Sequence, residues 1–232
     1  YNTVSNSPKY FPGTDIRTNG AAPDSIIVQS SAINMTGKIS KRVKSENPFI
    51  KYSIDNLSAG FNISSQNRSD AIMKSVDVSK ISTNVDYNLR FPSDNYVEAF
   101  KWAERVPLIG EQLSETKFFY TPSTFGSSIK LNRNLTEKFS RKTNELVEDF
   151  SLGLERRFTV NYKVFDNTQL NYSKNIRSDM SEYREEVLNK LKVGSLTNLN
   201  ESINYSFGPQ WISWFKPNFT YNTNYTWNLS LI

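Results

Sequence analysis

The sequence predicts an all-β fold: a segment of an antiparallel β-barrel with long loops and one or two short helices. Three observations support this prediction. Apolar and polar residues alternate with a period of two in several runs, as in strands with one apolar face. Only 37% of the 232 residues are hydrophobic but 13% are aromatic, which suits one-sided sheets better than helical bundles. Several runs last about 11 to 14 residues, whereas strands of soluble proteins average about 5–6.

Residues 1–30 are dense in Pro, Gly, Asn and Ser and show no sustained period, so they predict an irregular loop. Residues 31–232 are expected to form strands of a larger barrel. The first run places four apolar residues on one face, with Lys38 and Arg42 on the other: Ile33, Met35, Ile39 and Val43. Gly37 lies on the apolar face of this run and could mark a bulge.

Two short alternating runs follow, over residues 49–54 and 57–63, and their parity slips at residues 55–56, which indicates a turn or a bulge. A polar tip over residues 66–70 leads into a longer run over residues 81–91. Ile81, Val85 and Leu89 share one face of that run, and Asn84 lies on the other. Its length matches the ~9–11 tilted residues with which a strand crosses a bilayer.

The connection around residues 94–122 breaks the alternation. Its apolar residues have approximately helical spacing up to Pro107: Val97, Phe100, Trp102, Ala103 and Val106. We therefore expect a short amphipathic helix that covers a barrel end or, alternatively, lies flat on a membrane interface.

Strands resume over residues 125–135, and again over residues 150–154 and 158–164, with one interruption of the apolar parity at Arg156. Residues 166–168 are typical of a tight turn and predict a hairpin with the strand that follows. Residues 181–192 are highly charged and fit either a short helix or a loop. The last strands are expected over residues 199–207 and 219–231.

Several function classes are excluded by composition. The chain contains no Cys and no His, which removes thiol nucleophiles, Ser-His pairs and the common zinc-ligand sets. The net charge of +5 is scattered among acidic residues, so nucleic-acid binding is not expected. We expect no cofactor, no metal and no enzymatic activity. A barrel-type enzyme that uses Asp149 and Glu155 as paired carboxylates is a third hypothesis.

Alternation alone does not separate a membrane barrel from a soluble sandwich. The long runs, the polar faces rich in Asn, Ser and Thr, and the aromatic residues near run ends favour a barrel in lipid. The residues expected to face lipid are Ile81, Val85, Leu89, Phe219, Tyr225, Trp227 and Leu229. The residues expected to face an aqueous lumen are Lys38, Arg42, Asn84, Lys130 and Asn222. A soluble secreted β-rich adhesin or binding module is the alternative.

Several segments resemble one family. Residues 105–110 (RVPLIG), 118–123 (FFYTPS) and 129–133 (IKLNR) are similar to SprA (Sov), the outer-membrane translocon of type IX secretion and gliding motility. Residues 47–52, 57–64, 157–162 and 221–227 also resemble this family. Since such a translocon is far longer than 232 residues, we expect an internal segment of a larger protein, and the start at Tyr1 fits that expectation.

The resemblance implies a very large barrel in the bacterial outer membrane that conducts folded cargo to the cell surface. It implies as partners the outer-membrane lipid, the rest of the barrel chain, secreted protein cargo and a gating lipoprotein or plug subunit. No catalytic residue is carried over by the resemblance. The expected role is therefore that of a structural wall segment in a protein-conducting barrel.

Overall fold

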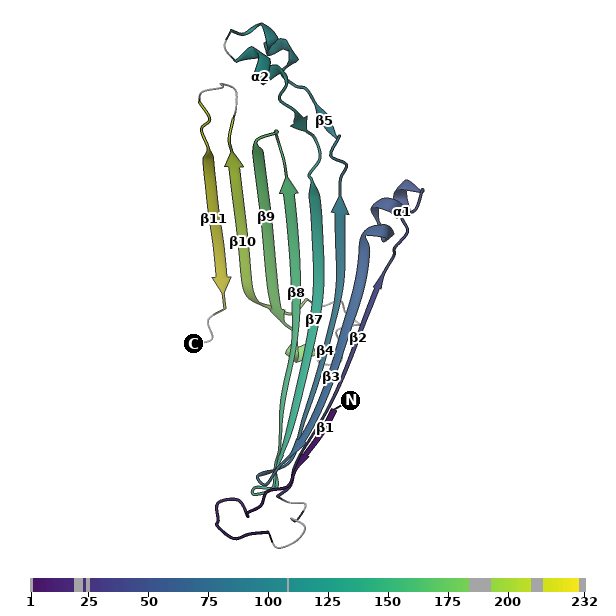
Figure 1. Cartoon of the computed structure of the whole chain (residues 1–232), viewed down its shortest axis with the longest axis vertical. Helices are drawn as coiled ribbons and strands as arrows, with labels where there is room; N and C mark the ends of the chain where they lie inside the picture. Colours follow the sequence, from purple (N-terminus) through teal and green to yellow (C-terminus); the bar gives the residue numbers. More distant parts are fainter. Residues whose placement is uncertain are drawn as a thin grey trace.

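A computed structural model describes residues 2–18, 23, 26–107, 109–183, 193–209 and 215–229 of the chain. Its main element is a nine-stranded antiparallel sheet in which each strand pairs with its neighbours in sequence order, β1-β2-β3-β4-β7-β8-β9-β10-β11 (Figure 1). The strands are β1 (Asn2–Asn6), β2 (Val28–Ser40), β3 (Leu57–Ser69), β4 (Met73–Arg90), β7 (Thr124–Ser140), β8 (Leu146–Tyr162), β9 (Thr168–Asp179), β10 (Ser195–Phe207) and β11 (Phe219–Asn228).

The connections carry small elements. The β2–β3 connection holds α1 (Pro48–Tyr52) and η1 (Ile54–Asn56), and η3 (Ser181–Tyr183) follows β9. The β4–β7 connection contains β5 (Tyr96–Val97), η2 (Lys101–Arg105), α2 (Gly110–Ser114) and β6 (Phe118–Phe119), with β5 and β6 paired in a two-stranded sheet. Figure 1 shows this small unit and α1 at the same end of the main sheet.

The prediction of an antiparallel all-β fold is confirmed, because 61% of the chain lies in strands and 10% in short helices. Within the described residues the main sheet is open rather than closed into a barrel. β11 has a neighbouring strand on one side only. β1 pairs with Val28–Ala32 of β2 and leaves the rest of that edge without a second strand.

The sheet has almost no core. The buried hydrophobic residues of the described chain are Ile26, Ala103, Leu152 and Met180. The accessible surface is 16677 Å², whereas a folded globular monomer of 26.7 kDa exposes about 11,000 Å². This excess arises because both faces of the long sheet are open over most of their area.

The prediction that residues 1–30 form an irregular loop is partly wrong. β1 lies within this segment, and β2 begins at Val28. β1 pairs with β2 through its backbone, and such pairing needs no hydrophobic period, so the sequence pattern gave no signal for it. At the other end, β2 stops at Ser40, so Arg42 and Val43 lie beyond the strand in which they were expected.

The alternating run over residues 49–54 forms α1 and η1 instead of a strand. Pro48 occupies the first turn of α1, and the Asn47 side chain caps the helix by accepting from the Phe49 backbone N–H at 2.9 Å. Gly37 marks no bulge, since β2 and β3 pair in continuous register past it. A Cβ there would lie 2.3 Å from the Phe61 ring, so the glycine makes room for that ring.

The 94–122 connection is less helical than predicted. η2 covers part of the expected helix, but α2, β5 and β6 were not predicted. β8 runs through Arg156 without a break, because the backbone ladder tolerates a change of side-chain polarity. The predicted charged helix or loop over 181–192 begins as η3, and residues 184–192 lie outside the described residues, as do Trp211, Trp214 and Leu231.

Candidate functional site

The sheet register separates the two groups of predicted site residues. Paired residues of adjacent strands point to the same side of a sheet. Lys38 pairs with Gly60, which pairs with Asn84, which pairs with Lys130. In the same register Asn222 pairs with Asn204 and through it with Asn171. Lys38, Asn84, Lys130 and Asn222 therefore share one face, here called the polar face.

Ile81, Val85, Leu89, Phe219, Tyr225 and Trp227 all lie on the opposite side, here called the apolar face. One pairing row crosses the sheet from β2 to β11 through this face: Ile39, Ala59, Val85, Ile129, Arg156, Ile176, Leu199 and Trp227. Its apolar side chains are open to the surroundings, with Ile39 72% exposed and Val85 49% exposed. Of the remaining predicted residues, Leu229 lies one position beyond β11 and Arg42 lies beyond β2.

The apolar residues form a belt that crosses the strands diagonally. In β2 they run from Ile33 to Ile39, which lie level with Ser79 to Val85 of β4. In β11 they run from Trp227, level with Val85, to Phe219, beyond the end of β4. Between β2 and β11 the apolar residues are thus displaced by about one residue per strand, although on β7 and β8 they also extend lower, to Phe139 and Leu146. With a rise of ~3.4 Å per residue and ~4.8 Å between strands, this slope corresponds to a tilt of about 35°.

Below the belt the same face is polar on β2, β3 and β4. On β2, β3 and β4 its side chains towards the β3–β4 turn are Gln29, Ser31, Ser65, Asn67, Ser69, Ser75, Asp77 and Ser79. In β4 the belt from Ile81 to Leu89 is about 27 Å long, and about 22 Å high once the tilt is included. The apolar residues are thus confined to a band on β2, β3 and β4, whereas on β7 and β8 they reach the lower end of the strands at Phe139 and Leu146.

Side-chain hydrogen bonds across the strands cover the polar face. Ser82 donates to Asn132 at 2.8 Å, and Ser128 donates to Asp86 at 2.6 Å. Towards the other edge, Asn161 donates to Thr124 at 2.7 Å. Ser173 and Ser202, at 2.7 Å, and Asn198 and Asn228 form further pairs. These groups can exchange bonds with water, so the face is suited to an aqueous environment.

A shallow hollow of about 450 Å³ lies on the polar face between β4, β7 and β8. Glu155 stands at its rim and contacts the guanidinium groups of Arg157 and Arg177, each at 3.7 Å. Gly126 lines the hollow at a point where there is no room for a side chain, because a Cβ there would lie 2.5 Å from the Thr159 hydroxyl. The hollow is lined by two acidic and two basic side chains, Asp86, Glu155, Lys130 and Arg157, together with small polar groups, and these residues form no catalytic constellation.

Charged residues interrupt the apolar face on β7, β8, β9 and β10. On β7, Arg133 pairs in register with Ile81 and its guanidinium lies over the Phe150 ring. Lys174 pairs in register with Glu201, their charged atoms are 3.6 Å apart, and the Tyr172 hydroxyl donates to the same carboxylate. Arg156 donates to the Ser178 hydroxyl at 2.9 Å. Arg156 is visible in the sequence as a break in parity, but the Lys174–Glu201 pair is not, because only the register brings these two residues together.

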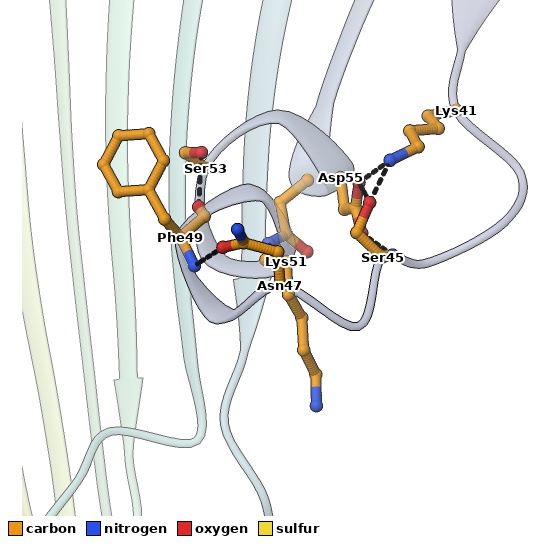
Figure 2. A network of polar contacts seen from close by, with 8 residues as sticks. Lys41, Ser45, Asn47, Phe49, Lys51, Ser53 and Asp55 are labelled. Atoms are coloured by element: carbon orange, nitrogen blue, oxygen red, sulfur yellow. Dashed lines mark hydrogen bonds and ion pairs between the residues drawn. The ribbon is translucent and has the colours of Figure 1, made fainter.

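The network at the β2–β3 connection is the other polar centre of the molecule (Figure 2). The Asp55 carboxylate is 1% exposed and accepts from Lys41 at 2.5 Å and from the Ser45 backbone N–H. These two donors, the Lys41 ammonium first, hold the pKa of Asp55 below its ordinary value. The network fixes the path of the chain between β2 and α1.

The geometry gives no support to the carboxylate-pair hypothesis. Asp149 and Glu155 lie on the same strand, six residues apart. Their separation is about 20 Å along the strand, well beyond the ~5–9.5 Å that glycosidase carboxylates need. Within the described residues no group of three or more acidic side chains is placed to hold a metal ion. None of the described helices has the length and apolar character needed to cross a membrane.

Comparison with known proteins adds no relative. No protein-family model matches the chain, and no curated protein matches it.

Proposed function

We propose that this chain is a wall segment of a large outer-membrane β-barrel that conducts secreted proteins, as in the SprA family that the sequence resembles. The observation that carries the proposal is the diagonal apolar belt. Membrane barrels tilt their strands by about 35–45° and carry an outward apolar band about 25 Å tall. On this sheet the displacement of the belt between β2 and β11 corresponds to a tilt of about 35°, and the belt on β4 has a height of about 22 Å.

The absence of a cover over the belt also supports the proposal. Isoleucine, valine and tryptophan side chains on an open face cost free energy in water, at about 25 cal/mol per Å² of apolar surface. Lipid removes that cost without a second protein layer. A soluble sandwich or adhesin would need another sheet or helix over this face, and Ile39 and Tyr225 remain open in the described chain.

The sheet edges support a larger wall. Backbone N–H and C=O groups on the free edges of β11 and of upper β2 have no strand partner in the described chain. In lipid such groups must be paired, so further strands are needed on both sides. We infer that the rest of the barrel chain supplies them. The polar face then lines an aqueous lumen, through which cargo passes without any chemical step.

The direct test is an antibody against this segment on fractionated native cells. We expect a band in the outer membrane far heavier than 26.7 kDa. An outer-membrane band near 26.7 kDa would contradict the wall-segment proposal and indicate a small barrel. A soluble or secreted band near that mass would overturn the membrane location and favour the adhesin or binding-module alternative.

Transport itself is tested by photo-crosslinking in growing cells. A photoreactive residue at Asn84 or Asn222 on the polar face should form adducts with secreted proteins. The matched residue at Val85 or Tyr225 on the apolar face should not. Adducts of equal yield from both faces would exclude a lumen lined by the polar face.

A further inference from the structure

The β2–β3 connection, residues 41–56, combines exposed apolar side chains with basic ones. Four of its residues are basic, Lys41, Arg42, Lys44 and Lys51, and two are acidic, Glu46 and Asp55. Four large apolar side chains are exposed in the same segment: Val43, Phe49, Tyr52 and Ile54. Phe49 is 78% exposed, one of the highest values for a large apolar side chain in the described chain.

The connection is held in one shape by its own hydrogen bonds. Asn47 caps α1, and the Ser53 hydroxyl donates to the Phe49 carbonyl at 2.5 Å. Asp55 binds Lys41 and Ser45, so the enclosed carboxylate is neutralised within the connection. Figure 2 shows the Phe49 ring and the Lys51 side chain directed away from the Asp55 network. The remaining charged residues of the connection are Arg42, Lys44, Lys51 and Glu46, so the connection keeps a net positive charge.

The connection lies at the margin of the apolar belt and on the same side of the sheet. Ile39 is the last apolar residue of β2 within the belt, and the connection begins two residues later. The Tyr87 hydroxyl, which stands on the apolar face, donates to the Tyr52 carbonyl at 2.5 Å. This bond ties α1 and η1 to the apolar face instead of the polar one.

We infer that the β2–β3 connection binds the anionic phosphate surface of the bilayer, as an anchor at the membrane boundary. This inference rests on the proposed function, because the belt must lie in lipid for its margin to meet headgroups. Aromatic side chains are favoured at this depth, and Lys and Arg reach the phosphates above them. Each basic residue near an anionic lipid surface strengthens binding to that surface. Arg42, Lys44 and Lys51 supply the charge, and Phe49 enters the boundary layer.

Spin labelling tests the inference, since the chain has no Cys and single labels can be placed freely. The probes are Phe49→Cys in the connection, Val85→Cys in the belt and Ile72→Cys as a matched exposed apolar residue at the β3–β4 turn. The full-length protein is reconstituted in vesicles of phosphatidylcholine, with or without phosphatidylglycerol. The ratio of oxygen to nickel-complex accessibility reports the depth of each label.

We expect the Val85 label deep in the bilayer, the Phe49 label at the phosphate level and the Ile72 label in water. Phosphatidylglycerol should draw the Phe49 label deeper, and the triple variant Arg42→Gln, Lys44→Gln, Lys51→Gln should abolish that shift. Lys41 is left intact, because it holds Asp55.

The outcomes separate the two proposals. A Val85 label in water would overturn the proposed membrane wall itself. A deep Val85 label with a Phe49 label as water-exposed as Ile72 would overturn the anchor alone. A Phe49 depth that is the same in both vesicles and in the triple variant would show insertion without phosphate recognition, and would also contradict the inference.

Discussion

The upper and lower halves of β3 and β4 differ in chemistry although they share one continuous register. On the apolar face the upper half carries Phe61, Ile63, Ile81 and Val85, while the lower half carries Ser65, Asn67, Asp77 and Ser79. The Asn67 amide donates to the Asp77 carboxylate in the lower half. Backbone pairing is thus independent of the medium, and the side chains alone mark where we propose lipid ends and water begins.

The largest expected effect on stability comes from a charge placed inside the belt, compared with the same charge placed below it. Val85→Arg puts a cation in the centre of the belt and should cost about 2–4 kcal/mol in lipid. Ser65→Arg on the same face of the lower half should cost little, and so should Asn84→Arg on the polar face. Unfolding in urea after reconstitution measures all three. Equal tolerance at Val85 and Ser65 would refute a lipid-facing belt.

A smaller effect is expected where the belt is tightly packed. Gly37→Val drives a side chain into the Phe61 ring, which lies 2.3 Å from the position of a Cβ, and should cost about 1–3 kcal/mol. Gly153 on the polar face has nothing within 4 Å of that position, so Gly153→Ala should be neutral or slightly stabilising. Thermal unfolding measures the stability of both variants. A destabilised Gly153→Ala variant would contradict an open polar face.

Removal of an acidic residue should destabilise the protein more on the apolar face than on the polar face. Glu201→Ala leaves Lys174 on the apolar face without its carboxylate and should be the more destabilising of the two changes. Glu155→Ala on the polar face leaves Arg157 and Arg177 in water and should cost less than about 1 kcal/mol. The double variant Lys174→Ala, Glu201→Ala should recover part of the loss. Without that recovery, the pair would not be the source of the effect.

The smallest expected effect is a pH dependence at the lower end. Asp70 at the β3–β4 turn accepts from the Met73 and Ile72 backbone N–H groups at 2.8 and 2.9 Å, and these bonds lower its pKa. Its contribution is therefore present above the unfolded-state pKa of about 3.9 and is lost as pH falls through the lower folded-state value. Amide protection at this turn, measured relative to the intrinsic exchange rate at each pH, should fall below about pH 4, and Asp70→Asn should remove the change.

The sequence predicted most strands because side-chain alternation is a local property. It could not predict the diagonal course of the belt or the Lys174–Glu201 pair, since both depend on the register between strands that are distant in sequence. The segment that forms α1 was predicted as a strand, because the spacing of Phe49, Tyr52 and Ile54 fits both a helix and a strand. The helix-start signals Asn47 and Pro48 were present in the sequence. β1 escaped prediction because its pairing uses backbone alone.

The strand order has a consequence for how this wall is assembled. Every pairing in the main sheet joins strands that are consecutive within that sheet, with β5 and β6 inserted only between β4 and β7, so each new strand finds its template in the one formed just before it. The search needed for each step is short, and the entropic cost of closing each loop is correspondingly small. Such a sheet can grow by adding one hairpin at a time, and its growing edge is the site at which a folding catalyst would have to act.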